Sequence, residues 1–452
     1  MIPKLQHWWQ EMRSSFWFVP AVIVVGAVGL AAGLIALDTS AELHVDKRWP
    51  LIFGSGASGA RGLLSSVAGS MITVAGVVFS ITIVVLSLSS SQYTSRVLRN
   101  FMRDRVNQIV LGVFVGIFAY CLVVLRTIRG GDEGAFVPSL AVLGGLVLAF
   151  VGIGCLIFFI HHISMSIQAS SIIAAAAEET IAAVDQLFPK ELGNSTDEDD
   201  GPLAAFAESA WSTVASRKTG YIESIDGDAL LAWARDRKTI LRMERGIGEF
   251  VVKGAPLVSV AGPGEPDEES AAELKAIYFI SRQRSVQQDA GFGIRQIVDI
   301  AIKALSSGVN DTTTAVMCVD YLGAILARLA IRGIAPLHRL DQGELRVIAR
   351  GPSFESLLAE AFDQIRQNAD GNVAVLTRQL QALETIARQT ANTRRRQALR
   401  QQAGLIAAVA ERTIPSPHDG AGVKAASVCL FRVLDTPCLR HASPSEEKQE
   451  IS

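Results

Sequence analysis

Four long apolar runs in the first third of the chain place the strongest constraint on its fold. They lie at about residues 16–37, 63–88, 109–125 and 136–160, and each approaches or exceeds the roughly 20 residues that a helix needs to cross a bilayer core. Backbone polar groups in lipid must be satisfied internally, which a helix does by itself. We therefore predict an N-terminal domain of four transmembrane helices over residues 1–165.

The loop charges predict the orientation of these helices. The connection 89–108 carries Arg96, Arg99, Arg103 and Arg105, whereas acidic residues offset the arginines of the connection 126–135. Arginine-rich short loops stay on the cytoplasmic side, so both chain termini are expected in the cytoplasm. The four arginines then either bind anionic lipid headgroups or form a positive vestibule at the cytoplasmic mouth of a pore.

One side of the second apolar run carries small and hydroxylated residues at regular spacing. Steps of four and three residues connect Ser66, Ser70, Thr73, Val77, Ser80, Val84, Ser87 and Ser91. This is a heptad-type seam on one side of a helix, about 37 Å long at 1.5 Å per residue. Either the seam packs against another helix, as small residues do in membranes, or several subunits arrange it around a pore. In a pore, Val77 and Val84 would be hydrophobic constrictions.

Two adjacent histidines, His161 and His162, lie at the cytoplasmic end of the fourth run. Neighbouring helix positions point about 100° apart, so this pair is poorly placed to chelate one metal ion. The pair is interpreted as an interfacial anchor. A second interpretation is a pH-sensitive gate, because histidine titrates near neutral pH.

The composition changes after residue 165, and the remainder is expected to form a cytosolic α+β domain. We expect a helical and acidic linker at 166–202, a small β-barrel-like module at 203–265, a mainly helical part at 266–415 and a flexible tail at 416–452. In the β-rich module, "GEFVVKGAPL" resembles the turn of lipoyl-type domains, although the carrier-lysine hairpin is missing. Glycines permit its turns, and we expect Phe250, Val252 and Leu257 to face the core.

The most distinctive soluble stretch is "DAGFGIRQIVDIAIKALSSGVNDTTTA", residues 289–315. Its pattern predicts two helices joined by a turn, with Asn310 or Asp311 capping the second helix. The alternative is a small-ligand or ion site built from Asp289, Asp299, Asn310 and Asp311. A basic segment, "RRRQALR" at 394–400, is interpreted as a solvated or membrane-facing helix surface rather than a nucleic-acid reader.

The motifs of several enzyme classes are missing from the sequence. No CxxC pair connects the five cysteines, and no phosphate-binding loop, GxSxG, HExxH or dinucleotide-binding fingerprint occurs. The nearly balanced charge gives no reason to expect nucleic acid. We therefore predict no enzymatic activity, no cofactor and no metal.

Four segments together carry a resemblance to a known family. They are "MITVAGVVFSITIVVLSLSSSQYTSRVLRNFMRD", "FFIHHISMSIQ", "SRKTGYIESID" and "GFGIRQIVDIAIKALSSGVNDTTTAVMCVDYL". The chain resembles the bacterial predicted-membrane-protein family called domain of unknown function 2254 over roughly residues 10–415. It departs from that family at "SSGVNDTTTA", where prolines are expected. The resemblance implies four membrane spans in the bacterial inner membrane and a cytosolic C-terminal domain, and it supplies no activity.

These observations give one leading functional hypothesis and one alternative. The leading hypothesis is an oligomeric channel-like pore, lined by the second transmembrane helix and assembled or gated by the cytosolic domain. The alternative is a non-conducting membrane scaffold or stress-sensing module that binds a cytosolic protein. The expected partners are membrane lipid and further copies of the chain.

Overall fold

The structure is a computed structural model that describes residues 17–41, 56–92, 105–129, 136–188, 210–262, 264, 266–334 and 337–436. The chain divides into two compact units, Met1–Ser171 and Ile172–Ser452.

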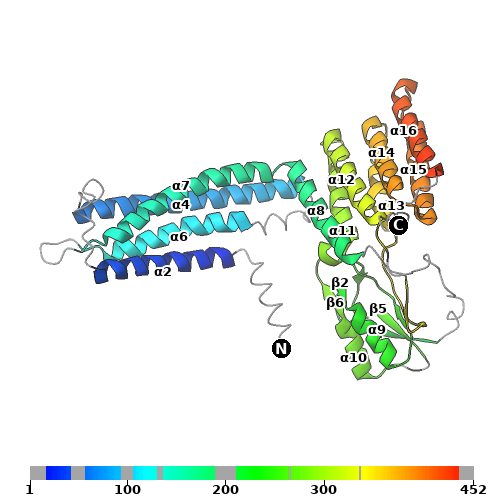
Figure 1. Cartoon of the computed structure of the whole chain (residues 1–452), viewed down its shortest axis with the longest axis horizontal. Coiled ribbons are helices and arrows are strands. Elements are labelled where there is room, and N and C mark those ends of the chain that lie inside the picture. Colours follow the sequence, from blue (N-terminus) through cyan, green and yellow to red (C-terminus); the bar gives the residue numbers. More distant parts are fainter. Residues whose placement is uncertain are drawn as a thin grey trace, which may run out of the picture. The chain divides into compact units, whose positions relative to one another are not determined.

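The first unit is a bundle of four long apolar helices (Figure 1). They are α2 (Phe18–Ala41), α4 (Gly56–Gln92), α6 (Arg105–Thr127) and α7 (Ser139–Ser166). In the described part of the chain, five helices are long and apolar enough to cross a membrane, namely these four and α12 of the second unit. Each of the four predicted runs lies largely or wholly within one bundle helix, and α4 extends further toward the N-terminus than predicted.

Close helix contacts at glycines hold the bundle together. A Cβ on Gly112 of α6 would lie 2.8 Å from Ile23 Cδ1 of α2, and one on Gly152 of α7 would lie 2.9 Å from Met71 Sδ of α4. Small residues allow such close approach between helices, which is how membrane helices gain packing energy. The buried Tyr120 hydroxyl donates to the Ala141 carbonyl at 2.7 Å.

Polar contacts join the helix ends on one side of the bundle. The Asp38 carboxylate, near the end of α2, accepts hydrogen bonds from the backbone N–H groups of Leu140 and Ala141 at 3.0–3.2 Å. It therefore satisfies free donors at the N-terminus of α7 and complements the helix dipole. On the same side, the Arg61 guanidinium donates to the Ile128 carbonyl at 2.7 Å.

Helix α8 (Ala169–Leu187) follows α7 after two residues, and from Ile172 onward it belongs to the second unit. Its buried residue Thr180 lies against Gly293, where a Cβ would be 2.8 Å from Thr180 Cγ2. Asp185 accepts hydrogen bonds from Arg328 at 2.7 and 2.9 Å and also pairs with Arg332. These contacts fix α8 to the second unit.

The β-rich part forms two sheets, so the prediction of a small barrel-like module needs correction. One sheet has the strand order β1-β5-β3-β8-β7 and the other β4-β2-β6. The strands are β1 (Trp211–Ala215), β2 (Gly220–Ile225), β3 (Leu241–Met243), β4 (Phe250–Val251), β5 (Pro256–Ala261), β6 (Tyr278–Ser281), β7 (His338–Asp341) and β8 (Glu344–Ile348). Three of them lie beyond residue 265 in the sequence, and these long-range pairings are not visible in local sequence patterns.

Two of the three residues predicted to face the core of the β-rich part are shifted by one position. Val251 is buried, whereas Phe250 and Val252 are half exposed, and Leu257 is buried as predicted. Side chains alternate between the faces of a strand, so an error of one residue exchanges the inner and outer sets. Gly248 and Gly254 have φ values of +83° and +89° and permit the turns as predicted.

Two short helices, α9 (Gly227–Asp236) and α10 (Glu268–Ile277), belong to this part.

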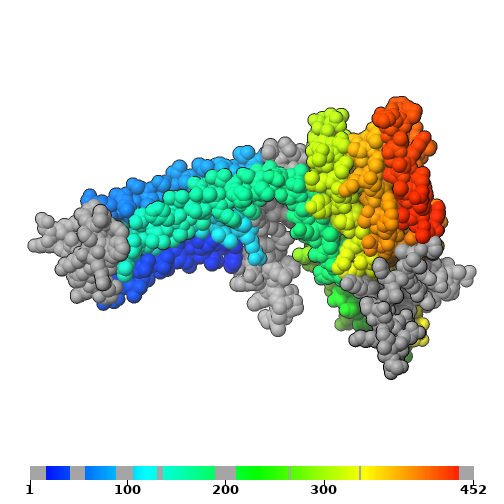
Figure 2. All heavy atoms as spheres, turned by 45° about the horizontal axis from the view of Figure 1, so that its top comes forward, coloured from blue at the N-terminus to red at the C-terminus, as the bar shows by residue number. Residues whose placement is uncertain are grey.

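The rest of the second unit is helical. It contains α11 (Ala290–Leu305), α12 (Thr312–Ala330), α13 (Phe354–Gln367), α14 (Val373–Gln389), α15 (Thr393–Thr413) and α16 (Pro417–Asp435). Helices α12, α14 and α16 lie side by side (Figure 1, Figure 2). The expected flexible tail from residue 416 is therefore wrong for 417–435, because Ser416 caps α16 and its apolar face packs on α14 and α15.

Two arginines of the basic segment 394–400 cap helix ends inside the second unit. Arg395 is buried and donates to the carbonyls of Ala330 and Arg332 at 3.0 Å, where α12 ends. The Arg396 guanidinium reaches the last carbonyls of both α14 and α16. Guanidinium groups suit the negative end of a helix dipole. The interpretation of these two arginines as a solvated or membrane-facing surface is wrong.

Candidate functional site: the polar face of α4

Helix α4 has two seams with the same spacing, one buried and one exposed. The buried seam consists of Leu64, Ala68, Met71, Ala75, Val78, Thr82 and Val85. The predicted hydroxyl seam lies two residues further along the chain at each position, which corresponds to about 200° around a helix. Packing of the buried seam against α6 and α7 therefore turns the hydroxyl seam away from the bundle.

Each described side chain of the hydroxyl seam is exposed in the single chain. These residues are Ser66, Ser70, Thr73, Val77, Ser80, Val84 and Ser87. Val77 and Val84, the two apolar members of the seam, have 51% and 63% of their surface exposed. The four described helices of the bundle therefore leave the seam uncovered.

Three glycines widen this surface, and the sequence interpretation did not include them. Gly62, Gly69 and Gly76 follow a seven-residue spacing, and each lies three or four residues from a member of the seam. A Cβ at any of the three would meet nothing within 4 Å. We call the hydroxyl seam together with these glycines the α4 polar face. The seven-residue glycine repeat was visible in the sequence and could have identified this part of the surface.

Two hydroxyls of the α4 polar face, those of Thr73 and Ser80, bond to their own helix. Thr73 Oγ1 donates to the Gly69 carbonyl at 2.8 Å, and Ser80 Oγ donates to the Gly76 carbonyl at 2.9 Å. This back-bonding satisfies the hydroxyl donor inside lipid, while the hydroxyl oxygen keeps its acceptor lone pairs. The face can therefore either pack closely against another helix or offer oxygen acceptors to water and ions.

Most of the residues predicted for the cytoplasmic mouth are not among those that the structure describes. Arg96, Arg99 and Arg103 are outside the described residues, and Ser91 belongs to the last turn of α4 without a described side chain. Arg105 is the first residue of α6 and is exposed.

The two histidines lie in the last turns of α7. His161 is exposed, whereas His162 is partly buried. The His162 ring stacks on Phe158 with ring centroids 6.0 Å apart, and its Nε2 lies 3.3 Å from Ser166 Oγ. The pair is thus divided between two environments. The pH-sensitive gate stays a hypothesis.

The four polar residues predicted for a cytosolic ligand site do not form one cluster. Asp289 caps the N-terminus of α11, and Asp311 caps α12, which begins beyond the other end of α11. These two positions are about 24 Å apart along a helix of this length. Asp299 pairs with Arg295 at 2.9 Å, and Asn310 occupies the intervening turn with a φ of +49°.

The two aspartates at these helix ends have structural roles that explain their position. The hydroxyl and the backbone N–H of Thr314 donate to Asp311 at 2.6 and 3.0 Å, and these bonds hold the pKa of Asp311 below its ordinary value. Asp289 accepts from the Phe292 backbone N–H at 3.0 Å and pairs with Arg284 at 2.7 Å. Within the described residues, no group of three histidine, cysteine or acidic side chains could hold a metal ion.

Comparison with known proteins identifies the family to which this chain is similar. A family model described as "Predicted membrane protein (DUF2254)" matches residues 13–385. Two similar relatives are uncharacterized proteins of Mycobacterium tuberculosis and Mycobacterium bovis. Each is 33% identical over 440 residues, which cover 96% of this chain and 83% of the relative. No solved structure matches the chain.

Proposed function

This chain belongs to the DUF2254 family of predicted membrane proteins, as its motifs predicted, and we propose that it forms an oligomeric channel-like pore. The pore lies in the bacterial inner membrane, with both termini in the cytoplasm. Helices α2, α4, α6 and α7 cross the bilayer. Helix α12 does not cross it, because its apolar residues are buried among the other helices of the second unit.

The observation that carries this proposal is the exposure of the α4 polar face in the single chain. Elsewhere the outward surface of the bundle carries large apolar side chains such as Val25, Phe150 and Ile157, which suit lipid, together with the exposed glycines Gly26, Gly29 and Gly33 of α2. Glycine and serine offer little apolar area to acyl chains, so this face gains more from another copy of α4 or from water than from lipid. Several copies would bring their α4 helices around one axis.

Within this pore, the hydroxyls and the valines have different roles. The Thr73 and Ser80 oxygens supply acceptors to a hydrated path. Val77 and Val84 lie on the same face, where rings of valine would form narrow hydrophobic constrictions that gate by dewetting. The second unit assembles or gates the pore, since α8 follows α7 directly and is fixed to that unit through Asp185.

A second candidate function is a non-conducting scaffold or stress-sensing module that binds a cytosolic protein. The back-bonded hydroxyls of Thr73 and Ser80 favour it, because a satisfied donor is also what a dry helix interface needs. In that case copies of α4 pack face to face, and the second unit presents its helices to the partner. Neither candidate includes an enzymatic step or a cofactor.

Flux through liposomes tests the proposal and separates the two candidates. The purified chain is reconstituted and assayed with a panel of inorganic cations and anions, and the matched variants are Thr73→Val and Thr82→Val. Both threonines belong to α4 and bond to the carbonyl four residues earlier, but Thr73 is exposed and Thr82 is buried. We expect flux that falls at least tenfold in T73V and persists in T82V. If no ion shows flux, the pore is excluded and the non-conducting scaffold is the remaining candidate.

A further inference from the structure

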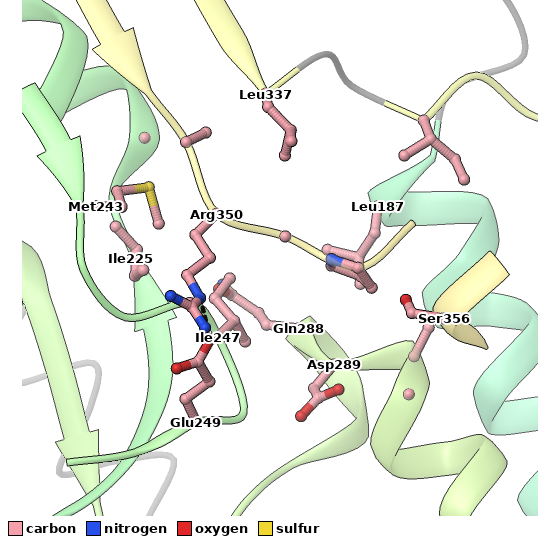
Figure 3. Close-up of a pocket in the computed structure, with 18 of the residues that line it drawn as sticks. Leu187, Ile225, Met243, Ile247, Glu249, Gln288, Asp289, Leu337, Arg350 and Ser356 are labelled. Atoms are coloured by element: carbon pink, nitrogen blue, oxygen red, sulfur yellow. Dashed lines mark ion pairs between the residues drawn. The ribbon is translucent and has the colours of Figure 1, made fainter. Parts of the chain in front are cut away.

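A cavity of about 540 Å³ lies within the second unit (Figure 3). The end of α8, the β3–β4 loop, the N-termini of α11 and α13, and the strands β7 and β8 surround it. Its apolar wall includes Leu187, Ile225, Met243, Ile247, Leu337 and Leu357. Sites for small molecules in proteins measure roughly 300–1,000 Å³ and combine an apolar wall with a few polar groups, so this cavity has the size of a ligand site.

The carboxylates that line the cavity are already paired with arginines. Glu249 pairs with Arg350 at 2.6 Å, as the dashed line in Figure 3 marks, and Asp289 pairs with Arg284 at 2.7 Å. The third carboxylate, Glu360, lies 3.3 Å from a guanidinium nitrogen of Arg295 on α11, which also pairs with Asp299. A cationic ligand would have to displace one of these guanidinium groups.

One lining guanidinium has no such partner. Arg339 of β7 lines the cavity, and among the described residues it has no carboxylate within ion-pair distance. Three carboxylates and three guanidinium groups line the cavity, and the exposed Arg339 is the guanidinium left without a carboxylate. The N-termini of α11 and α13, helices of 16 and 14 residues, add the positive ends of their dipoles. Since each lining carboxylate already has an arginine, the charged group left for a ligand is the Arg339 guanidinium, whose complement is an anion.

We propose that the cavity binds a small organic anion, with an apolar body and one carboxylate or phosphate group. The anionic group pairs with Arg339, which can hold it through two parallel hydrogen bonds. The apolar body packs against the wall around Met243 and Leu337. The same chemistry occurs in a fatty acid released from the membrane and in a nucleoside monophosphate.

The position of the cavity brings its occupant into contact with the end of α8. Leu187 and Phe188 line it, and they follow Asp185, which fixes α8 to Arg328 and Arg332. A ligand in contact with Leu187 stabilises the C-terminal end of α8. Binding to the folded state alone raises stability with ligand concentration, so the ligand strengthens the attachment of α8.

Direct binding measurements on the full chain in lipid nanodiscs test this proposal independently of any ion flux. The probes are octanoate and AMP, titrated by calorimetry with empty nanodiscs subtracted. The variants are Arg339→Gln, which removes the free guanidinium, and Leu337→Trp, which fills the cavity at a half-exposed position. Arg217→Gln is the control, because Arg217 is exposed and does not line the cavity.

We expect at least one probe to bind with one site per chain. Its affinity should fall at least tenfold in both R339Q and L337W and stay unchanged in R217Q. Binding of octanoate alone would assign an acyl anion, and binding of AMP alone would assign a nucleotide. The proposal is overturned if neither probe binds, or if the affinity survives in either cavity variant.

Discussion

Thr180 of α8 occupies the space that a side chain at Gly293 of α11 would need. A Cβ on Gly293 would lie 2.8 Å from Thr180 Cγ2 and 2.9 Å from Thr180 Cβ. Thr180 is fully buried, and its hydroxyl donates to the Ala176 carbonyl at 2.6 Å, so it has little freedom to move. This contact holds the helix that follows α7 against the second unit.

Replacement of Gly293 by alanine should therefore loosen α8. Overpacking of a closed contact destabilises a protein by about 1–3 kcal/mol, and we expect this loss in the free energy of unfolding of the second unit. Denaturant unfolding of the full chain measures it. The double variant with Thr180→Ala should recover most of the loss. Gly308→Ala is the control, because a Cβ there meets nothing within 4 Å. An equal loss in G308A would contradict the role of this contact.

The ion pairs of Asp185 should make the same attachment sensitive to acid. The hydrogen bond from Arg328 is the main cause that holds the pKa of Asp185 below its ordinary value. A carboxylate with a lowered native pKa contributes stability above its unfolded pKa of about 3.9, and this contribution is lost as the pH falls through the native pKa.

The variant Asp185→Asn tests this dependence. At pH 7 its free energy of unfolding should be about 1–3 kcal/mol lower than that of the wild type. Hydrogen bonds to charged groups contribute that much, and Arg332 is left buried without its carboxylate. The difference between wild type and variant should shrink below about pH 4. Denaturant midpoints between pH 3 and pH 7 measure it, with the exposed Asp228→Asn as control. A difference that is independent of pH would contradict the assignment.

Substitution of Gly112 should open the membrane bundle. A valine there cannot be accommodated, because Ile23 Cδ1 and the backbone Cα of Pro20 would both lie within 3 Å of its Cβ. The buried thiol of Cys121 reports the opening, and its labelling in detergent should become at least tenfold faster in Gly112→Val. The matched control is Gly26→Val on α2, where a Cβ meets nothing within 4 Å. Equal labelling rates in both variants would refute this packing.

Loss of the Arg396 guanidinium should release α16. Its four hydrogen bonds reach carbonyls at the ends of α14 and α16 at 2.6–3.3 Å. In Arg396→Ala we expect faster hydrogen exchange over 417–435, because these carbonyls lose a charged donor. Arg412→Ala is the control, since Arg412 is exposed and forms an ion pair with the equally exposed Asp370 at 3.6 Å. Unchanged exchange in R396A would mean that apolar packing alone holds α16.

Local patterns in the sequence predicted the elements that depend on local chemistry. The four apolar runs correspond to α2, α4, α6 and α7, and the capping role of Asp311 is confirmed. Helix α16 was missed because two prolines were interpreted as the start of a flexible tail. Pro417 instead occupies the first turn of the helix, where proline is well tolerated.

Features that depend on distant contacts could not be predicted in this way. The sheet β1-β5-β3-β8-β7 joins strands more than 100 residues apart, and the cavity is lined from six separate segments of the second unit. The spacing of Ser70, Thr73 and Ser80 defined the seam on α4. Only the packing of the opposite seam on α6 and α7 determined that this seam faces outward.

In the proposed pore, the α4 polar face lines a hydrated path between several copies of the chain. Thiol labelling in liposomes tests it directly, with Ser80→Cys and the outward-facing Val25→Cys of α2 in a chain without native cysteines. A membrane-impermeant charged methanethiosulfonate should modify S80C and block flux, while V25C stays unmodified because lipid covers it. If S80C reacts no faster than V25C and ion flux is unchanged, the α4 polar face does not line a pore.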